Sequence, residues 1–166
     1  RESLIRSRID PDVRSEVEAA PGVEQASGLG IALVGGRVPG EDDIANLAVV
    51  GFEQPVRSMP DTVDLAPDEA LADRSLRDAG VDLGDVVEVG TARTPVTVIG
   101  WVEDTDFLQQ SGFWVRPDTW RTILGDSRPD ATLPPGTFQA LVVGTEPGAD
   151  VSRVAADIDA ATAGET

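Results

Sequence analysis

The side chains that could do chemistry in this chain are carboxylates, hydroxyls and guanidinium groups, because the sequence has no His, Cys, Lys or Tyr. Without His, the chain lacks a side chain whose ordinary pKa lies near neutral pH and which could serve as a general base. Without Cys and Lys, it lacks a thiolate, which could be a nucleophile or a soft metal ligand, and an amine for a Schiff base. The residue types therefore predict a domain that is not an enzyme and that holds no cofactor.

Two acidic clusters, Asp42–Asp43 and Glu103 to Asp106, offer the oxygen ligands that a hard cation such as Ca²⁺ accepts. Neither has the alternating acids, central Gly and terminal Glu of a calcium-binding loop. Because the chain contains 30 Asp and Glu residues, local clusters are expected, and we predict that both are solvated loops. Hydrolysis by two carboxylates is the one enzyme reaction that the composition permits, and it would need two acids converging in a cleft.

The aromatic residues are concentrated in one stretch of twenty residues, which contains Trp101, Phe107, Phe113, Trp114 and Trp120. We expect Trp101, Phe113 and Trp120 to belong to a core. Phe107 lies in a polar stretch that is typical of an exposed loop, and Trp114 alternates with Phe113 on a short strand, so it should face the opposite side. If both are exposed, Phe107 and Trp114 form an apolar patch that contacts a partner or a substrate.

Size and charge narrow the possible partners. The chain has 166 residues, which suits one domain or one domain with an insertion. Its net charge of −17 repels phosphate backbones, so we predict no binding to nucleic acid. The first residue is Arg and the one Met, Met59, is internal, so we expect a chain that is either processed or cut from a longer protein. No apolar run in it approaches the roughly 20 residues that span a bilayer.

Periodicity and turn residues predict an α+β fold with a mixed sheet. Asp10 and Pro11 are typical of a helix start, and Asp150 of another. Gly28 and Gly30 indicate a bent or bulged strand rather than a dinucleotide-binding loop. The predicted strands are 23–34, 44–52, 86–89, 96–102, 112–115 and 138–143, and the predicted helices are 10–20, 68–79, 117–124 and one that follows Asp150.

The order of these elements predicts two subdomains. Residues 1–56 and 136–166 would form a two-layer α/β sandwich with a mixed sheet, built from both ends of the chain. Residues 57–135 would form a small β-rich subdomain inserted into it.

The segment from Asp73 to Val102 contains a short helix, a bend at Gly84–Asp85, a strand, and a second strand with Gly100 at its centre. This order resembles the extracytoplasmic, MacB-like periplasmic core domain of FtsX/MacB-family ABC transporter permeases. The strand and Trp-containing helix from Gly112 to Trp120 resemble the haem-exporter-like actinobacterial branch of that family. In these motifs Gly84 would permit the bend and Asp85 would bond nearby amides.

The resemblance implies a domain between the first two of four transmembrane helices, on the extracytoplasmic face of the cell membrane. It implies a permease homodimer with a cytoplasmic ABC ATPase subunit, in which the domain couples ATP-driven helix motion to export or release of a substrate. The motion would be hinge or shear near Val56 and Gly136. The alternative is a soluble module that binds a ligand or peptide in an aromatic cleft lined by Trp101, Trp114 and Trp120.

Overall fold

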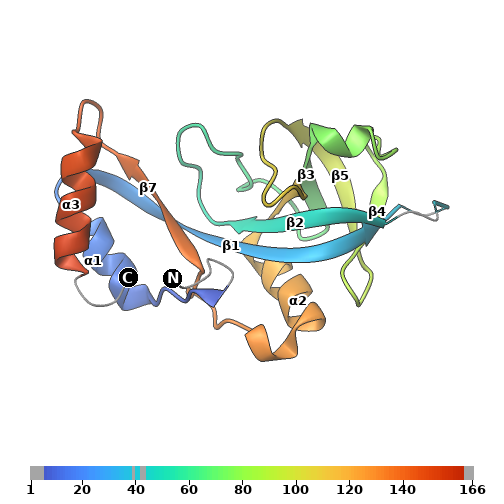
Figure 1. The fold of residues 1–166 in the computed structure, drawn as a ribbon, viewed down its shortest axis with the longest axis horizontal. Coiled ribbons are helices and arrows are strands. Elements are labelled where there is room, and N and C mark those ends of the chain that lie inside the picture. The colour runs from blue at the N-terminus through green and yellow to red at the C-terminus, as the bar shows by residue number, and fades with distance from the viewer. Residues whose placement is uncertain (1–5, 39, 42–43, 163–166) are drawn as a thin grey trace.

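The computed structural model describes residues 6–38, 40–41 and 44–162, so the predicted acidic cluster Asp42–Asp43 lies outside the described residues. The described part contains three α-helices and seven strands (Figure 1). The helices are α1 (Pro11–Glu18), α2 (Pro117–Ser127) and α3 (Val151–Ala161). The strands are β1 (Val23–Arg37), β2 (Ile44–Phe52), β3 (Glu69–Asp73), β4 (Val86–Val89), β5 (Thr94–Val102), β6 (Ser111–Val115) and β7 (Ala140–Thr145).

Strand β1 runs through both parts of the molecule (Figure 1). Its first half pairs with β7, from Val23 to Leu29, and its second half pairs with β2, from Leu29 to Arg37. Both pairings are antiparallel. At 15 residues, β1 is the longest strand described, and both parts of the molecule contain a segment of it.

Six strands close into a ring in the order β1–β2–β6–β3–β5–β4, and β4 returns to β1. The β2–β6 and β3–β5 pairs are parallel and the other pairs in the ring are antiparallel. Alternate side chains enter the main core, as Val87 and Val89 do on β4, because successive side chains of a strand point to opposite faces. Helix α2 packs against β1 and β2 and adds Trp120, Ile123 and Leu124 to that core.

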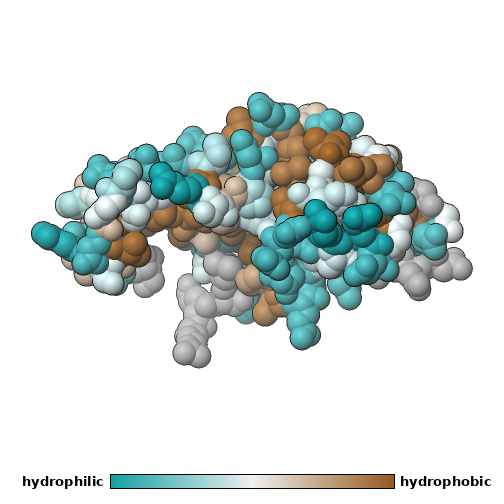
Figure 2. Space-filling model, turned by 90° about the horizontal axis from the view of Figure 1, so that it is seen from above, coloured by the Kyte–Doolittle hydropathy of each residue, from teal (hydrophilic) through white to brown (hydrophobic). Residues whose placement is uncertain are grey.

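Hydrophobic side chains also reach the surface of this ring. Figure 2 shows brown surface over the part of the molecule that the ring forms, between hydrophilic residues. The large hydrophobic residues exposed in this part include Leu83, Ile99 and Leu108, whose exposed fractions are 56%, 46% and 66%.

The other part of the molecule consists of α1, α3, β7 and the first half of β1. Helix α1 packs on β1 through the buried Val13 and Val17, and α3 packs beside α1 (Figure 1). As predicted, Asp150 caps α3, because its carboxylate accepts hydrogen bonds from the amides of Ser152 (2.9 Å) and Arg153 (3.2 Å). Pro11 begins α1 as predicted, but the side chain of Asp10 makes no capping hydrogen bond.

The predicted α+β fold class with a mixed sheet is confirmed, since the helices pack on one sheet of parallel and antiparallel strands. The predicted helix over 68–79 is wrong: residues 69–73 form β3, and only 74–77 form a 3₁₀ turn. Strand β3 lies between β5 and β6, and this pairing on both sides outweighs a local helical preference. The predicted end of the first strand before Gly35 is also wrong, because β1 stays paired with β2 as far as Arg37.

The division into subdomains 1–56 plus 136–166 and 57–135 stays a prediction. The sheet is continuous across its boundary, since β2 of the first segment pairs with β6 of the insertion.

Candidate functional site

The place where the two parts meet is built on glycines of β1 and β2. Gly28 leaves room for the ring of Phe138, and Gly30 and Gly51 leave room for Trp120. A Cβ atom at Gly51 would lie 2.5 Å from Cβ of Trp120, and one at Gly28 or Gly30 would overlap the aromatic rings themselves. The register has no shift at Gly28 in the β1–β7 pairing or at Gly30 and Gly51 in the β1–β2 pairing. Of the bent or bulged strand that was predicted, the bulge is therefore not formed at these residues, and the glycines allow the close approach of the two rings.

The two rings that pack against these glycines stack on one another. Trp120 of α2 and Phe138, which precedes β7, have ring centroids 6.0 Å apart and an interplanar angle of 7°. They are 0% and 1% exposed. Because Trp120 belongs to the ring part and Phe138 leads into β7, their contact joins the two parts directly.

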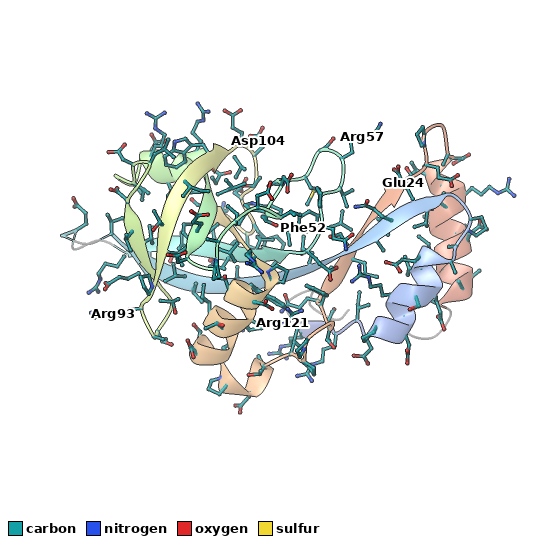
Figure 3. The ribbon with its side chains drawn as sticks, turned by 180° about the vertical axis from the view of Figure 1, so that it is seen from behind. Glu24, Phe52, Arg57, Arg93, Asp104 and Arg121 are labelled. Atoms are coloured by element: carbon teal, nitrogen blue, oxygen red, sulfur yellow. The ribbon has the colours of Figure 1, made fainter. Side chains whose placement is uncertain are left out.

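A guanidinium group covers this stack. Arg121 lies on α2 beside β1, where the two parts meet (Figure 3). Its Cζ is 4.7 Å from the ring centroid of Phe138 and 5.6 Å from that of Trp120, within the range of a cation–π contact. It also donates a long hydrogen bond to the carbonyl of Thr137 (3.5 Å). We call Trp120, Arg121 and Phe138, together with Gly28, Gly30 and Gly51, the junction.

An ion pair between Arg14 and Glu53 holds helix α1 next to the junction. Arg14 lies 2.6 Å from the carboxylate of Glu53 and also donates to the carbonyl of Ala26 (3.0 Å). The same Glu53 oxygen accepts a hydrogen bond from the amide of Gly28 (3.2 Å). Burial alone would lower the pKa of Arg14, but hydrogen bonds and charges from Glu18 and Glu53 outweigh it and raise the pKa.

The contacts in this region are ring packing, cation–π contacts and an ion pair. Its groups are aromatic rings, a permanently charged guanidinium and a carboxylate that is already paired with Arg14. In the described part of the chain, no group of three or more acidic residues is placed to hold a metal ion. The junction therefore holds helix α2 and the segment before β7 against β1, and the Arg14–Glu53 pair holds helix α1 beside them.

The structure places the two predicted contact residues differently from the expectation. Trp114 faces away from Phe113, as predicted, but it is 5% exposed and packs edge-on against Phe52, with centroids 5.8 Å apart. The expected exposure of Trp114 is therefore wrong. The reason is that the connection after β2 folds over this face and contributes Val56 and Met59 to a second cluster.

Phe107 is half-buried against that second cluster. Its amide donates to the carbonyl of Gln110 (2.9 Å), closing a tight turn in which Leu108 and Gln109 have positive φ. Leu108, at the tip of this turn, is the exposed apolar residue. In the sequence, the polar residues around Leu108 were the one indication that it is exposed.

The three tryptophans do not line a common cleft. Trp120 lies in the main core inside the ring, Trp101 packs half-buried against that core, and Trp114 belongs to the second cluster. The aromatic cleft expected from the alternative hypothesis is therefore not formed by these residues.

The bend residues occupy the local positions expected from their types. Gly84 has a φ of +90°, which favours glycine, and its amide donates to the carbonyl of Val98 (2.8 Å). The Asp85 carboxylate accepts from the amide of Asp82 (2.8 Å). Gly100 lies opposite Leu71, directly after a shift in the β3–β5 register.

Sequence reasoning missed a buried carboxylate at the end of β3. Asp73 is 5% exposed, and its two oxygens accept four hydrogen bonds, from the amides and hydroxyls of Ser75 and Thr105 (2.7–2.9 Å). Burial alone would raise its pKa, but these hydrogen bonds outweigh it and hold the pKa of Asp73 below its usual range. Glu103, Asp104 and Asp106 of the neighbouring loop are exposed, as predicted.

We expect replacement of Asp73 by alanine to lower the free energy of unfolding by about 3 kcal/mol, because buried donors lose their acceptor. Since the folded-state pKa is lowered, the stabilisation by Asp73 is fully present above the ordinary Asp pKa and is lost as pH falls through the folded value. Urea unfolding at neutral pH and at about pH 3 measures both effects. An equal stability difference between wild type and variant at both pH values would contradict the pH dependence.

Comparison with known proteins places this fold among transporter domains. No family model matches the sequence, and no curated protein matches it. The structure is similar to the extracellular domain of the noncanonic ABC-type transporter YknZ from Gram-positive bacteria, with a TM-score of 0.61 and 14% identity. That match covers 92% of this chain and 81% of the other.

It is also similar to the periplasmic region of MacB from Actinobacillus actinomycetemcomitans. The TM-score is 0.60 and the identity 14%, over 92% of this chain and 72% of the other. At these identities the shared property is the fold. The chain therefore has the fold of the extracytoplasmic domains of ABC-type transporters.

Proposed function

We propose that this chain is an extracytoplasmic, non-enzymatic domain of a MacB-like ABC transporter permease. In this proposal the permease is a membrane-anchored homodimer that works with a cytoplasmic ATPase subunit. The domain couples ATP-driven motion of transmembrane helices to the export or release of a substrate. The observation that carries the proposal is the fold shared with transporter domains over 92% of the chain.

The position of the first and last helices supports an insertion between two membrane spans. Helices α1 and α3 pack side by side at the same end of the molecule (Figure 1). Polypeptide on either side of them would therefore leave from one end and could reach one membrane surface. No helix in the described ranges is long and apolar enough to cross a membrane.

The junction supports transmission of force through one body. Strand β1 belongs to both parts, and the Trp120–Phe138 stack fills the glycine gaps on it. A hinge at Val56 and Gly136 would have to separate this stack or bend β1. We propose that both parts move together as a lever on the transmembrane helices, and that the expected hinge motion is the alternative to be tested.

The absence of Cys from this chain makes a labelling test direct, once any cysteines elsewhere in the full-length permease are replaced. In the permease with its ATPase, Arg153→Cys carries a spin label on α3 of each protomer, and distances are measured between the two labels. We expect the distance to differ between nucleotide-free and ATP-bound states by several ångström. Identical distance distributions in the two states would overturn the coupling proposal.

A second pair of labels separates lever motion from hinge motion. Thr91→Cys in the ring part and Ser152→Cys on α3 are introduced into one protomer of the dimer. For a lever, their separation is the same in both nucleotide states. A change in this separation would favour a hinge between the parts and contradict motion as one body.

The finer placement in the haem-exporter-like branch is also a proposal, and it rests on the segment from Gly112 to Trp120. Trp120 has a packing role in the core, and with no His, Cys or Tyr the chain offers few ligands for haem iron. If haem is the substrate, we propose that its iron is bound elsewhere in the permease.

A further inference from the structure

Three arginines meet at one hollow in a molecule whose net charge is −17. Arg37 ends β1, Arg93 lies in the turn between β4 and β5 (Figure 3), and Arg128 directly follows α2. The hollow has a volume of about 330 Å³, which suits a small ligand. Three separate elements thus bring cationic side chains to the same place.

These guanidinium groups are available for a ligand. Within residues 6–38, 40–41 and 44–162, none of the three has an ion-pair, hydrogen-bond or ring partner, whereas Arg14, Arg74 and Arg121 all have carboxylate partners. Among the described residues that line the hollow there is one carboxylate, that of Glu88, whose Cα lies opposite that of Arg37 in the β1–β4 pairing. The described residues that line the hollow therefore carry a net positive charge, whereas the chain as a whole has a net charge of −17.

The hollow is lined by Leu33 and Val34 of β1 and by the hydroxyl of Ser127. Leu33 packs against the second cluster and Val34 against the main core, because successive side chains of a strand point to opposite faces. The hydroxyl of Ser127 is buried and has no hydrogen-bond partner among the described residues. A Cβ atom at Gly90 would lie 2.8 Å from this hydroxyl, so glycine leaves the space beside it open.

Two hydrogen bonds to backbone carbonyls hold the hollow in shape. The amide of Gly90 donates to the carbonyl of Gly35 (2.9 Å), and the hydroxyl of Thr91 donates to the carbonyl of Asp126 (3.1 Å). These bonds fix the β4–β5 turn against β1 and against the end of α2. The positions from which Arg93 and Arg128 extend are thereby set by the fold.

We propose that this hollow binds a small organic anion, with the guanidinium groups on its phosphate or carboxylate and its apolar part against the β1 residues that line the hollow. Guanidinium groups form short, charge-assisted hydrogen bonds with both kinds of oxyanion. In a molecule that repels anions overall, such binding depends on these local cations. The inference goes beyond the proposed transport role and does not depend on it.

The test uses the purified 166-residue chain with octyl phosphate as the probe. Binding is measured by calorimetry and by amide NMR at low salt. Octanoate tests the carboxylate form of the same chemistry, inorganic phosphate tests the headgroup alone, and octyl glucoside tests the tail with a neutral head. We expect octyl phosphate or octanoate to bind and to shift the amide signals of residues 90–93 and 127–128. Inorganic phosphate should bind more weakly, and octyl glucoside should not bind.

Charge-matched variants assign the binding to the hollow. Arg37→Gln, Arg93→Gln and Arg128→Gln together are expected to weaken binding by about tenfold or more. The control combines Arg57→Gln, Arg74→Gln and Arg153→Gln, which removes the same charge from exposed positions elsewhere and should change binding by less than about twofold. Glu88→Gln removes the carboxylate of the hollow and should tighten binding.

Three results would overturn the proposal. They are no binding of either anionic amphiphile to the wild-type chain, equal weakening by the two triple variants, and equal binding of octyl glucoside. Circular dichroism checks that each variant is folded. If the hollow triple variant does not fold, the Glu88→Gln result decides, because unchanged or weaker binding in that variant contradicts the assignment.

Discussion

Replacing Gly30 with alanine is expected to lower the free energy of unfolding by about 3 kcal/mol, at the upper end of the usual cost of overpacking a core. The added methyl group would overlap the indole of Trp120, which is fully buried and in contact with the Phe138 ring. The ring can move only by disturbing the core inside the strand ring, because protein interiors are close-packed. Urea unfolding, followed by tryptophan fluorescence, measures the change.

Gly144 on β7 supplies the matched control, since it is also a glycine within a strand. A Cβ atom there would come no closer than 3.4 Å to any neighbouring atom, so alanine should have little effect on stability. A companion variant, Trp120→Leu, removes the overlapping part of the ring and should recover part of the loss when combined with Gly30→Ala. If Gly30→Ala and Gly144→Ala have the same stability, the close approach at the junction is not a constraint.

Trp120→Ala is expected to destabilise the fold by about 4 kcal/mol, because it removes a fully buried ring from the core and from the stack with Phe138. Such a loss is a large fraction of the stability of an ordinary domain, which is about 5–15 kcal/mol. The indole N–H has no partner in the described part of the chain, so the loss comes from packing rather than from a hydrogen bond. Thermal and urea unfolding both report it.

Trp101→Ala is the control for this variant. Trp101 is half-buried and has the guanidinium of Arg77 over its ring at 5.8 Å, so its removal should cost clearly less than that of Trp120. A double-mutant cycle of Trp120→Ala and Phe138→Ala should give a coupling energy of about 1 kcal/mol. Additive effects in that cycle would contradict a direct role of the stack in joining the two parts.

The junction also explains which predictions from the sequence failed. Gly28 and Gly30 carried a visible signal, but glycine in a strand is compatible with a bulge, a bend or close approach. Only the packing of Trp120 and Phe138 against β1 decides between them, and these rings lie far from the glycines in sequence. The 68–79 segment failed for a related reason, since pairing with both β5 and β6 decides that 69–73 is a strand.

The sequence alone determined the absence of His, Cys and Lys chemistry, the α+β class, and most helices and strands, because these depend on residue types and on local periodicity. Only the tertiary structure decided that Trp114 is covered, that Asp73 is a buried acceptor, and that Arg37, Arg93 and Arg128 share a hollow. The physical reason is that burial and convergence depend on contacts between segments distant in sequence. A closed ring of strands sets those contacts, and no local pattern encodes them.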